Sequence, residues 1–247
     1  MEITDRELHL MVRDADDLNR AGMETMADDI AELHGGEGRR VMGASRRHFV
    51  EGIGATAIAL AIGGSLIPLS SLWSSAWAET GTDKSIAQFA ESVELAAVMA
   101  YTAAAATGKV TGTALTLAKT FSNHHRLHAN AFGSYAGDAT TARPNPGLAA
   151  AIGPRITAAA DQSALVRILY DLENSAAATY LVAIGALGDP AALKVTASIL
   201  PVESQHAVVL GNFLGMQPGD NSGTYLPAFL TKTAAVNPSQ SPIAAGS

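Results

Sequence analysis

Apolar residues recur through the second half of the chain at helical spacing, and clear stop signals divide this half into long segments. Within each segment the apolar positions return every three or four residues and are rich in Ala, which is typical of closely packed helices. We expect four helices, at about residues 83–106, 111–132, 161–187 and 190–214. The stretch 133–153 lacks strong helix signals, so we expect a long crossover there.

Ionisable residues interrupt the apolar stripes of the second and fourth helices at matched positions. Glu203 and His206 are three residues apart, and His125 and His128 have the same spacing. Residues i and i+3 share one helix face, so each pair points the same way. Apolar neighbours continue these stripes, which indicates that the pairs face the interior.

The first and third helices also share one polar pattern. Glu94 is followed seven residues later by Tyr101, and Glu173 is followed seven residues later by Tyr180. Each glutamate also precedes the ionisable pair of the next helix by nearly the same number of residues. The chain therefore reads as two helical hairpins in tandem, which predicts an all-α four-helix bundle with a pseudo-twofold axis and a long crossover.

The polar residues of these stripes have the chemistry of a metal site. A buried carboxylate needs an opposite charge, hydrogen bonds or a metal ion, and the absence of cysteine leaves only nitrogen and oxygen ligands. All four histidines after residue 78 lie in or beside the two pairs. A buried Glu–His hydrogen-bond cluster in a bundle that has lost its metal is the alternative. The predicted ligands are Glu94, His125, His128, Glu173, Glu203 and His206.

The region from about residue 84 to 218 resembles the ferritin-like superfamily, in particular its exported bacterial ferritin-like domain proteins. That resemblance implies a Glu on the first and third helices and Glu-x-x-His on the second and fourth, together binding two iron or manganese ions. The matching positions are Glu94 with Tyr101, Glu173 with Tyr180, and Glu203 with His206. His125 stands where the family has a bridging Glu, and His124 is an alternative partner for His128.

An imidazole in place of a bridging carboxylate leaves three carboxylates in the site. The resemblance implies iron, with manganese or zinc as alternatives. Imidazole suits Fe(II), Zn and Cu, and Mn less strongly, so one or two ions are expected. Glu94 and Glu173 are expected as terminal ligands and Glu203 as the bridge. The resemblance favours a redox centre that reacts with oxygen or peroxide. The alternative is a non-catalytic module of the cell envelope that binds a partner and has a degenerate metal site.

Tyr101 and Tyr180 lie two turns beyond the glutamates on the same stripe. They are either core residues with satisfied hydroxyl groups or outer donors and redox partners of the metal site.

A targeting signal is expected ahead of the bundle. Arg46 and Arg47 precede the uncharged run 52–72, and Ala76-Trp77-Ala78 fits a signal-peptidase site. The segment resembles a twin-arginine export signal, which implies the twin-arginine translocase and a signal peptidase as partners. We expect cleavage after Ala78 and a periplasmic or cell-envelope location. An uncleaved membrane anchor is the alternative.

These features divide the chain into four parts: an acidic leader extension at 1–44, the signal at 45–78, the bundle at 79–217 and a Pro/Ser/Gly-rich tail at 218–247. Thr4 and Glu7 form a capping-box pattern in the leader, which we interpret as a solubilising or chaperone-contacting segment. A separate functional module is the alternative. In the tail, residues 225–230 are apolar enough to pack onto the bundle.

The net charge is -7, and no basic patch with interleaved aromatics suggests nucleic-acid binding. For the quaternary structure, the sequence leaves a homodimer open.

Overall fold

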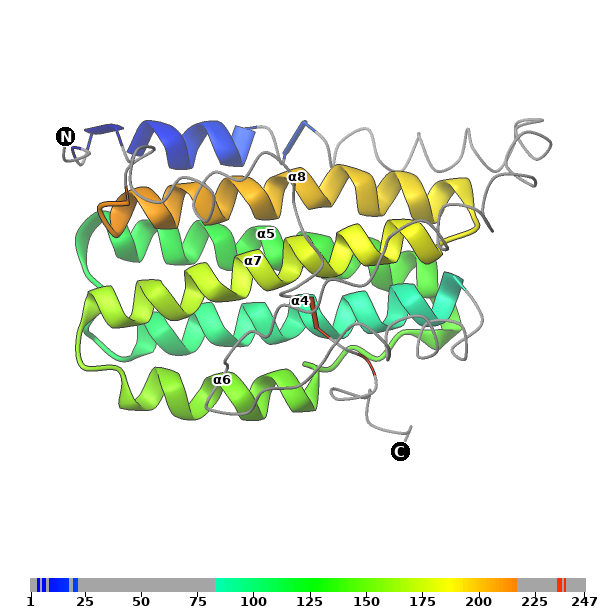
Figure 1. The fold of residues 1–247 in the computed structure, drawn as a ribbon, viewed down its shortest axis with the longest axis horizontal. Coiled ribbons are helices and arrows are strands. Elements are labelled where there is room, and N and C mark those ends of the chain that lie inside the picture. The colour runs from blue at the N-terminus through cyan, green and yellow to red at the C-terminus, as the bar shows by residue number, and fades with distance from the viewer. Residues whose placement is uncertain are drawn as a thin grey trace, which may run out of the picture.

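The computed structural model of the chain describes residues 83–216 continuously, with residues 4, 6–7, 9–17, 20–21, 235–236 and 238 outside that range. Within these residues the structure is helical and contains no strand. Four long helices form the bundle in Figure 1, so the predicted all-α architecture is confirmed. They are α4 (Asp83–Ala106), α5 (Gly112–Ala136), α7 (Gln162–Ala186) and α8 (Pro190–Phe213).

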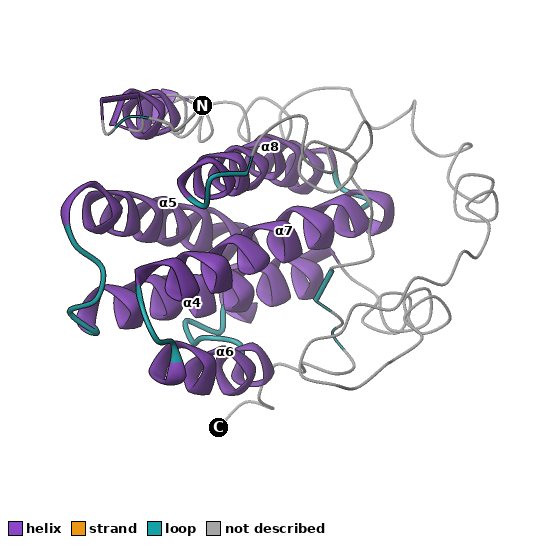
Figure 2. Ribbon diagram, turned by 60° about the vertical axis from the view of Figure 1, so that its left-hand side comes forward, coloured by secondary structure: helices purple, strands orange, loops and turns teal. Residues whose placement is uncertain are grey.

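Two helical hairpins make up the bundle, α4 with α5 and α7 with α8 (Figures 1 and 2). Side-chain caps fix where the second hairpin begins and turns. Asp161 accepts a hydrogen bond from the backbone of Ala164 at 2.8 Å, and Asp189 accepts one from Ala191 at 2.7 Å. Asp83, at the start of α4, accepts a bond from Gly188 N at 2.8 Å, which ties the two hairpins together at one end.

The crossover between the hairpins contains helices that the sequence pattern did not predict. α5 continues to Ala136, a 3₁₀ turn η2 (Gly137–Ala139) follows, and α6 (Pro146–Ala158) runs alongside α4. Glycine and proline inside α6 weaken its helix signal. Its formation depends on the Asn145 cap, which accepts from Leu148 N at 3.0 Å, and on burial of Ile152 and Ile156. Tertiary packing therefore overrides local propensity there.

Glu91 holds the start of this crossover against α4. Its buried carboxylate accepts hydrogen bonds from Thr140 Oγ1 at 2.5 Å and from Thr141 N at 2.8 Å. Gly133 on α5 permits this approach, because a Cβ at that position would lie 2.7 Å from Glu91 Oε1. The carboxylate of Glu91 is therefore structural and separate from the polar stripes.

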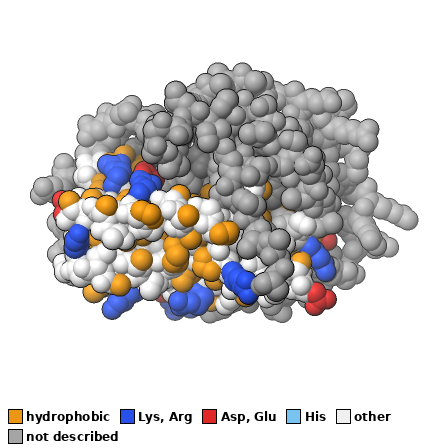
Figure 3. Space-filling view, turned by 90° about the horizontal axis from the view of Figure 1, so that it is seen from below, with side chains coloured by type: hydrophobic (Ala, Val, Ile, Leu, Met, Phe, Trp, Pro, Cys, Tyr) orange, Lys and Arg blue, Asp and Glu red, His pale blue; other side chains and the backbone are white. Residues whose placement is uncertain are grey.

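The core contains apolar clusters on both sides of the bundle's polar centre. One cluster includes Leu117, Phe121, Leu165, Leu169 and Leu210. The others include Phe89 and Val93, and Phe132, Val195 and Ile199. Burial of these side chains provides the main stabilisation of the bundle and keeps water away from its middle. Figure 3 shows the outer face on the α6 side, where apolar and uncharged side chains are bordered by lysines and arginines.

Part of the acidic leader packs on the bundle. The capping box is confirmed, since Thr4 N donates to Glu7 Oε2 at 2.8 Å and Glu7 N donates to Thr4 Oγ1 at 3.2 Å. Residues 9–17, called here the N-terminal helix, lie beside α8 and α5 (Figures 1 and 2). Its contact with the bundle goes beyond the solubilising role expected from sequence.

The export signal at 45–78 and the apolar segment 225–230 lie outside the described residues. In the described part of the tail, Val236 is buried and its N–H donates to Thr179 Oγ1 at 2.8 Å. Across the portions of the chain that the structure describes, no helix is long and apolar enough to span a membrane.

Candidate metal centre

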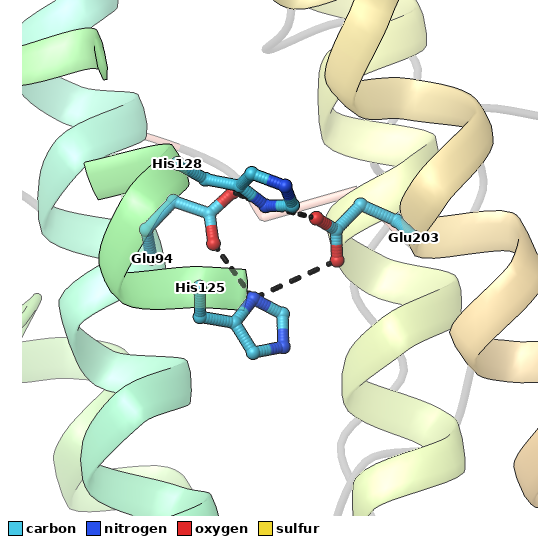
Figure 4. A group of neighbouring side chains, drawn as sticks. All are labelled: Glu94, His125, His128 and Glu203. Carbon is cyan, nitrogen blue, oxygen red and sulfur yellow. Dashed lines mark hydrogen bonds and ion pairs between the residues drawn. The ribbon is translucent and has the colours of Figure 1, made fainter. Parts of the chain in front are cut away.

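The six predicted ligands converge inside the bundle, where all four long helices contribute. None of the six has more than 1% of its surface exposed. They form two overlapping groups in which one ligand atom per residue lies within 4.8 Å of the others. The groups are Glu94, His125, His128 and Glu203, which Figure 4 shows, and His125, Glu173, Glu203 and His206. The two groups can each hold a metal ion.

His125 and Glu203 belong to both groups, whereas the other members belong to one group each. Glu94 and His128 come from the first hairpin, and their pseudo-equivalents Glu173 and His206 come from the second. Glu203 is therefore the carboxylate that both groups share. His124, the sequence-based alternative to His125, lies outside both groups.

The ring of His125 lies between two carboxylates. Its Nδ1 is 2.7 Å from Glu94 Oε2, and its Nε2 is 3.0 Å from Glu173 Oε1. A neutral imidazole can donate through only one nitrogen, whereas an imidazolium donates through both. Burial alone lowers the pKa of His125, but the charges of Glu173 and Glu203 outweigh burial and raise that pKa well above its usual value. In the metal-free chain His125 is therefore a cation that joins the two hairpins.

The remaining histidines also face carboxylates. His128 Nδ1 lies 2.8 Å from Glu203 Oε1, and His206 Nδ1 lies 3.3 Å from Glu173 Oε2. Burial opposes the charged form of His128, but Glu94 and Glu203 raise its pKa to about 9. Burial likewise opposes ionisation of Glu94, yet His128 and His125 lower its pKa to about 2. Without metal, protonated imidazoles therefore balance the ionised carboxylates.

Glu203 is the least satisfied member of the centre. It is fully buried, and among the described residues neither of its carboxylate oxygens accepts a hydrogen bond, so its contact with His128, 2.8 Å from Oε1, is an ion pair alone. A buried carboxylate without hydrogen bonds requires a nearby cation. Since the surrounding donors are carboxylate oxygens and imidazole nitrogens, the site fits a divalent transition-metal ion.

Two tyrosines link the hairpins through the ligand carboxylates. Tyr101 on α4 donates its hydroxyl hydrogen to Glu173 on α7, and Tyr180 on α7 donates to Glu94 on α4. Burial and the adjacent carboxylates raise the pKa of both phenols well above the usual value, so both remain donors. Their hydroxyl groups are satisfied, and each bond orients one carboxylate of the cluster, Glu173 or Glu94.

One contact beside the candidate ligands could not be predicted from the sequence pattern. His124 Nδ1 is 2.8 Å from His206 Nε2, and His124 Nε2 is 3.0 Å from Asp16 Oδ1 on the N-terminal helix. Burial and the charge of His206 lower the pKa of His124 to about 3, so this ring is neutral. Nothing in the periodicity of the leader distinguishes Asp16 from its acidic neighbours, because the contact depends on packing between distant segments.

Comparison with known families agrees with this geometry. Curated proteins and solved structures give no match. A family model described as a ferritin-like domain matches residues 82–216, which include every helix of the bundle and more than half of the chain. With its two hairpins, long crossover and buried Glu/His groups, the chain belongs to the ferritin-like domain family.

Proposed function

We propose that this ferritin-like chain holds one or two metal ions, iron in the first place and manganese or zinc as alternatives, in a redox centre that reacts with oxygen or peroxide. The observation that carries the proposal is the position of Glu203. Its carboxylate is buried, shared by both groups of ligands and without a hydrogen bond from the described residues. A metal ion would take over the positive charge that His128 and His125 provide beside this carboxylate in the metal-free chain.

The ligands have distinct roles in this proposal. Glu94 with His128 would hold metal at one end of the centre, and Glu173 with His206 would hold it at the other. Glu203 and His125 lie between the ends. The imidazoles release their protons when they become ligands, so metal uptake is coupled to proton release. A bound redox-active metal would supply electrons to the oxidant, while Tyr101 and Tyr180 hold the terminal carboxylates in place.

Export belongs to the same proposal. The arginine pair, the uncharged run and the Ala-x-Ala triplet at 45–78 support transport by the twin-arginine translocase and cleavage by a signal peptidase. We propose the periplasm or cell envelope as the place of action. An anchored form that retains the segment is the alternative. Fractionation of cells with and without active translocase tests the location, and a chain that stays in the cytoplasm in both would contradict it.

Metal analysis and anaerobic Fe(II) titration of the full chain test the centre directly. We expect one or two ions per chain, and Fe(II) oxidation by oxygen or peroxide that is faster than in buffer. A double variant with Glu203→Ala and His206→Ala should lose metal and keep its helical circular dichroism. Asp171→Ala, which removes an exposed carboxylate paired with Arg155, is the control and should bind as the wild type does. Metal retained by the double variant would exclude the assigned ligands.

A specific observation favours a second candidate, a non-catalytic ferritin-like module. The His125 imidazolium already occupies the space between Glu94 and Glu173 and provides part of the charge that a metal would provide. A chain that folds fully and binds no Fe, Mn, Zn or Cu would support this candidate. In that case the Glu/His cluster serves to hold the hairpins together, and a partner in the envelope would be sought by cross-linking.

A further inference from the structure

The N-terminal helix packs directly beside the metal centre. Val12 and Ala15 are buried in the apolar cluster that contains Leu117 and Phe121. Polar contacts fix the helix on both sides of this apolar strip. His9 Nε2 lies 3.3 Å from Thr113 Oγ1 on α5, and Asn212 on α8 donates to the sulfur of Met11 at 3.6 Å. The helix therefore contacts both α5 and α8.

A continuous chain of hydrogen bonds runs from this helix to the centre. Asp16 bonds to His124, and His124 bonds to His206, at 3.0 and 2.8 Å. The side chain of Asp16 is 41% exposed, whereas that of His124 is fully buried. The chain thus connects a solvent-accessible carboxylate with a ligand at the end of the centre that contains Glu173.

The order of donors and acceptors along this chain fixes the orientation of His206. An ionised Asp16 only accepts, so the Nε2–H of His124 donates to it. With that proton on Nε2, the Nδ1 of His124 is the acceptor for the Nε2–H of His206, 2.8 Å away. His206 is left with Nδ1 directed at Glu173 Oε2, 3.3 Å away, and at Glu203 Oε2, 3.8 Å away. That nitrogen is the one that can bind a metal.

The hydrogen-bond chain from Asp16 through His124 to His206 has no counterpart related by the pseudo-twofold axis of the bundle. His124 precedes His125 by one residue, and the corresponding position before Glu203 is Val202, a buried apolar side chain. The link from a ligand to the leader therefore distinguishes the His206 end of the centre. Partners that hold the outer nitrogen of a histidine ligand fix its tautomer and ring orientation.

We propose that Asp16 and His124 are positioning residues for His206, and that the N-terminal helix is a cap that slows the release of metal from the centre. The inference rests on the proposed metal-binding function. Because the helix precedes the predicted export signal, cleavage after Ala78 would separate the cap from the bundle. The capped centre is then the form that exists before processing, and the processed chain exchanges its metal more readily.

Release of Zn(II) from the full chain to an excess of chelator tests the cap. Asp16→Ala removes the partner of His124, one step beyond the ligand, and should accelerate release by up to about tenfold, the lower end of the effect of losing a direct partner of a metal ligand. Asp16→Asn keeps an acceptor oxygen and should give an intermediate rate. Val12→Asp, which opposes docking of the apolar side of the helix, should match Asp16→Ala. The control is Asp14→Ala, which removes an exposed carboxylate from the same helix and should leave the rate unchanged.

Nitrogen NMR of the histidines in the metal-free chain gives a second readout. We expect His124 to carry its proton on Nε2 alone, and Asp16→Ala to shift the signals of His124 and His206 while Asp14→Ala does not. Wild-type release rates and histidine spectra in Asp16→Ala would overturn the inference. A wild-type chain that binds no Zn(II) would overturn the metal function and with it the effect on release. The spectra would still decide whether Asp16 and His124 position His206.

Discussion

At the scale of single residues, His125 decides how the centre works. Its ring contacts Glu94 and Glu173 through its two nitrogens and lies in both groups that can hold a metal. As an imidazolium it stabilises the metal-free chain, and as a neutral ligand it would leave a bound metal with three carboxylates. Stability without metal and charge balance with metal therefore compete at one side chain.

His125→Glu should shift this competition toward metal binding. The variant replaces a cation with a fourth carboxylate, so the metal-free chain should lose about 3 kcal/mol of stability, as expected when a buried ion pair is broken. Metal should restore that stability, with two ions bound per chain. Urea unfolding with and without Fe(II), together with metal analysis, measures both effects. The neutral variant His125→Gln is the control, and equal metal binding by both variants would contradict the role given to His125.

Tyr101→Phe and Tyr180→Phe should have similar costs because the two hydroxyl groups occupy equivalent places. Each substitution removes the donor to one buried carboxylate, Glu173 or Glu94, and should lower the free energy of unfolding by about 2 kcal/mol. Tyr135→Phe, in a half-buried residue outside the centre, serves as the matched control. Urea denaturation of the metal-free chains measures the three values. If Tyr135→Phe lowered the free energy of unfolding by as much as the other two variants, the tyrosine–carboxylate hydrogen bonds would have no special contribution to stability.

At the scale of helices, the two hairpins meet through few but specific polar contacts. Asp83 accepts from the α7–α8 turn, the tyrosines cross between α4 and α7, and Glu91 fixes the crossover near the end of α5. The crossover can follow α4 closely because Gly133 leaves room for the Glu91 carboxylate. The position and orientation of the hairpins thus depend on the capping contact of Asp83 and on the close approach of Glu91 to Gly133.

Gly133→Ala should destabilise this junction. The added Cβ would lie 2.7 Å from Glu91 Oε1, and the carboxylate cannot move without losing its bonds to Thr140 and Thr141. We expect a loss of about 1 to 3 kcal/mol, typical of overpacking. Gly185→Ala is the control, since a Cβ on this α7 residue meets nothing within 4 Å and should be neutral or stabilising. Thermal unfolding of both variants measures the difference, and equal melting temperatures would contradict it.

At the scale of the whole molecule, the charges of the centre make stability depend on pH. The pKa of Glu94 is lowered from 4.5 to about 2, so its contribution is complete above pH 4.5 and is lost as the pH falls toward 2. The pKa of His128 is raised from 6.5 to about 9, so its contribution is complete below pH 6.5 and is lost as the pH rises toward 9. The centre thus favours the folded chain most in the window between the two unfolded values.

His124, whose pKa is lowered from 6.5 to about 3, opposes folding as the pH falls below 6.5, so the metal-free chain should be most stable at about pH 6.5, the upper end of that window, and lose stability on both sides. With metal bound, the cation replaces the imidazole protons, and the loss above pH 6.5 should shrink. Urea midpoints from acid to alkaline pH, with and without Zn(II), measure both curves. A flat profile between pH 6.5 and 9 in the metal-free chain would contradict the ionic character assigned to the centre.

Much of the bundle could be predicted because helical information is local. Apolar spacing and the signals at Asp83, Asp161 and Pro190 placed the four long helices within a few residues of their observed ends. The six candidate ligands could be chosen because Glu and His are scarce in this part of the chain and recur at matched helical spacing. The structure brings all six together, because residues at matched positions in the two hairpins lie at the same level along the bundle axis.

Three features depended on contacts between segments far apart in the chain. α6 forms in a stretch with weak propensity because Ile152 and Ile156 are buried on packing. Whether His124 or His125 faces the centre depends on how α5 is rotated about its own axis in the bundle. The sequence spacing does not fix that rotation, because the two residues are adjacent on the helix. Asp16 reaches His124 across the fold. The sequence alone thus determined the helices and the candidate ligands, because periodicity and composition are local properties. Only the tertiary structure decided that His125 rather than His124 enters the centre and that Asp16 contacts His124, because both outcomes depend on how the helices pack against one another.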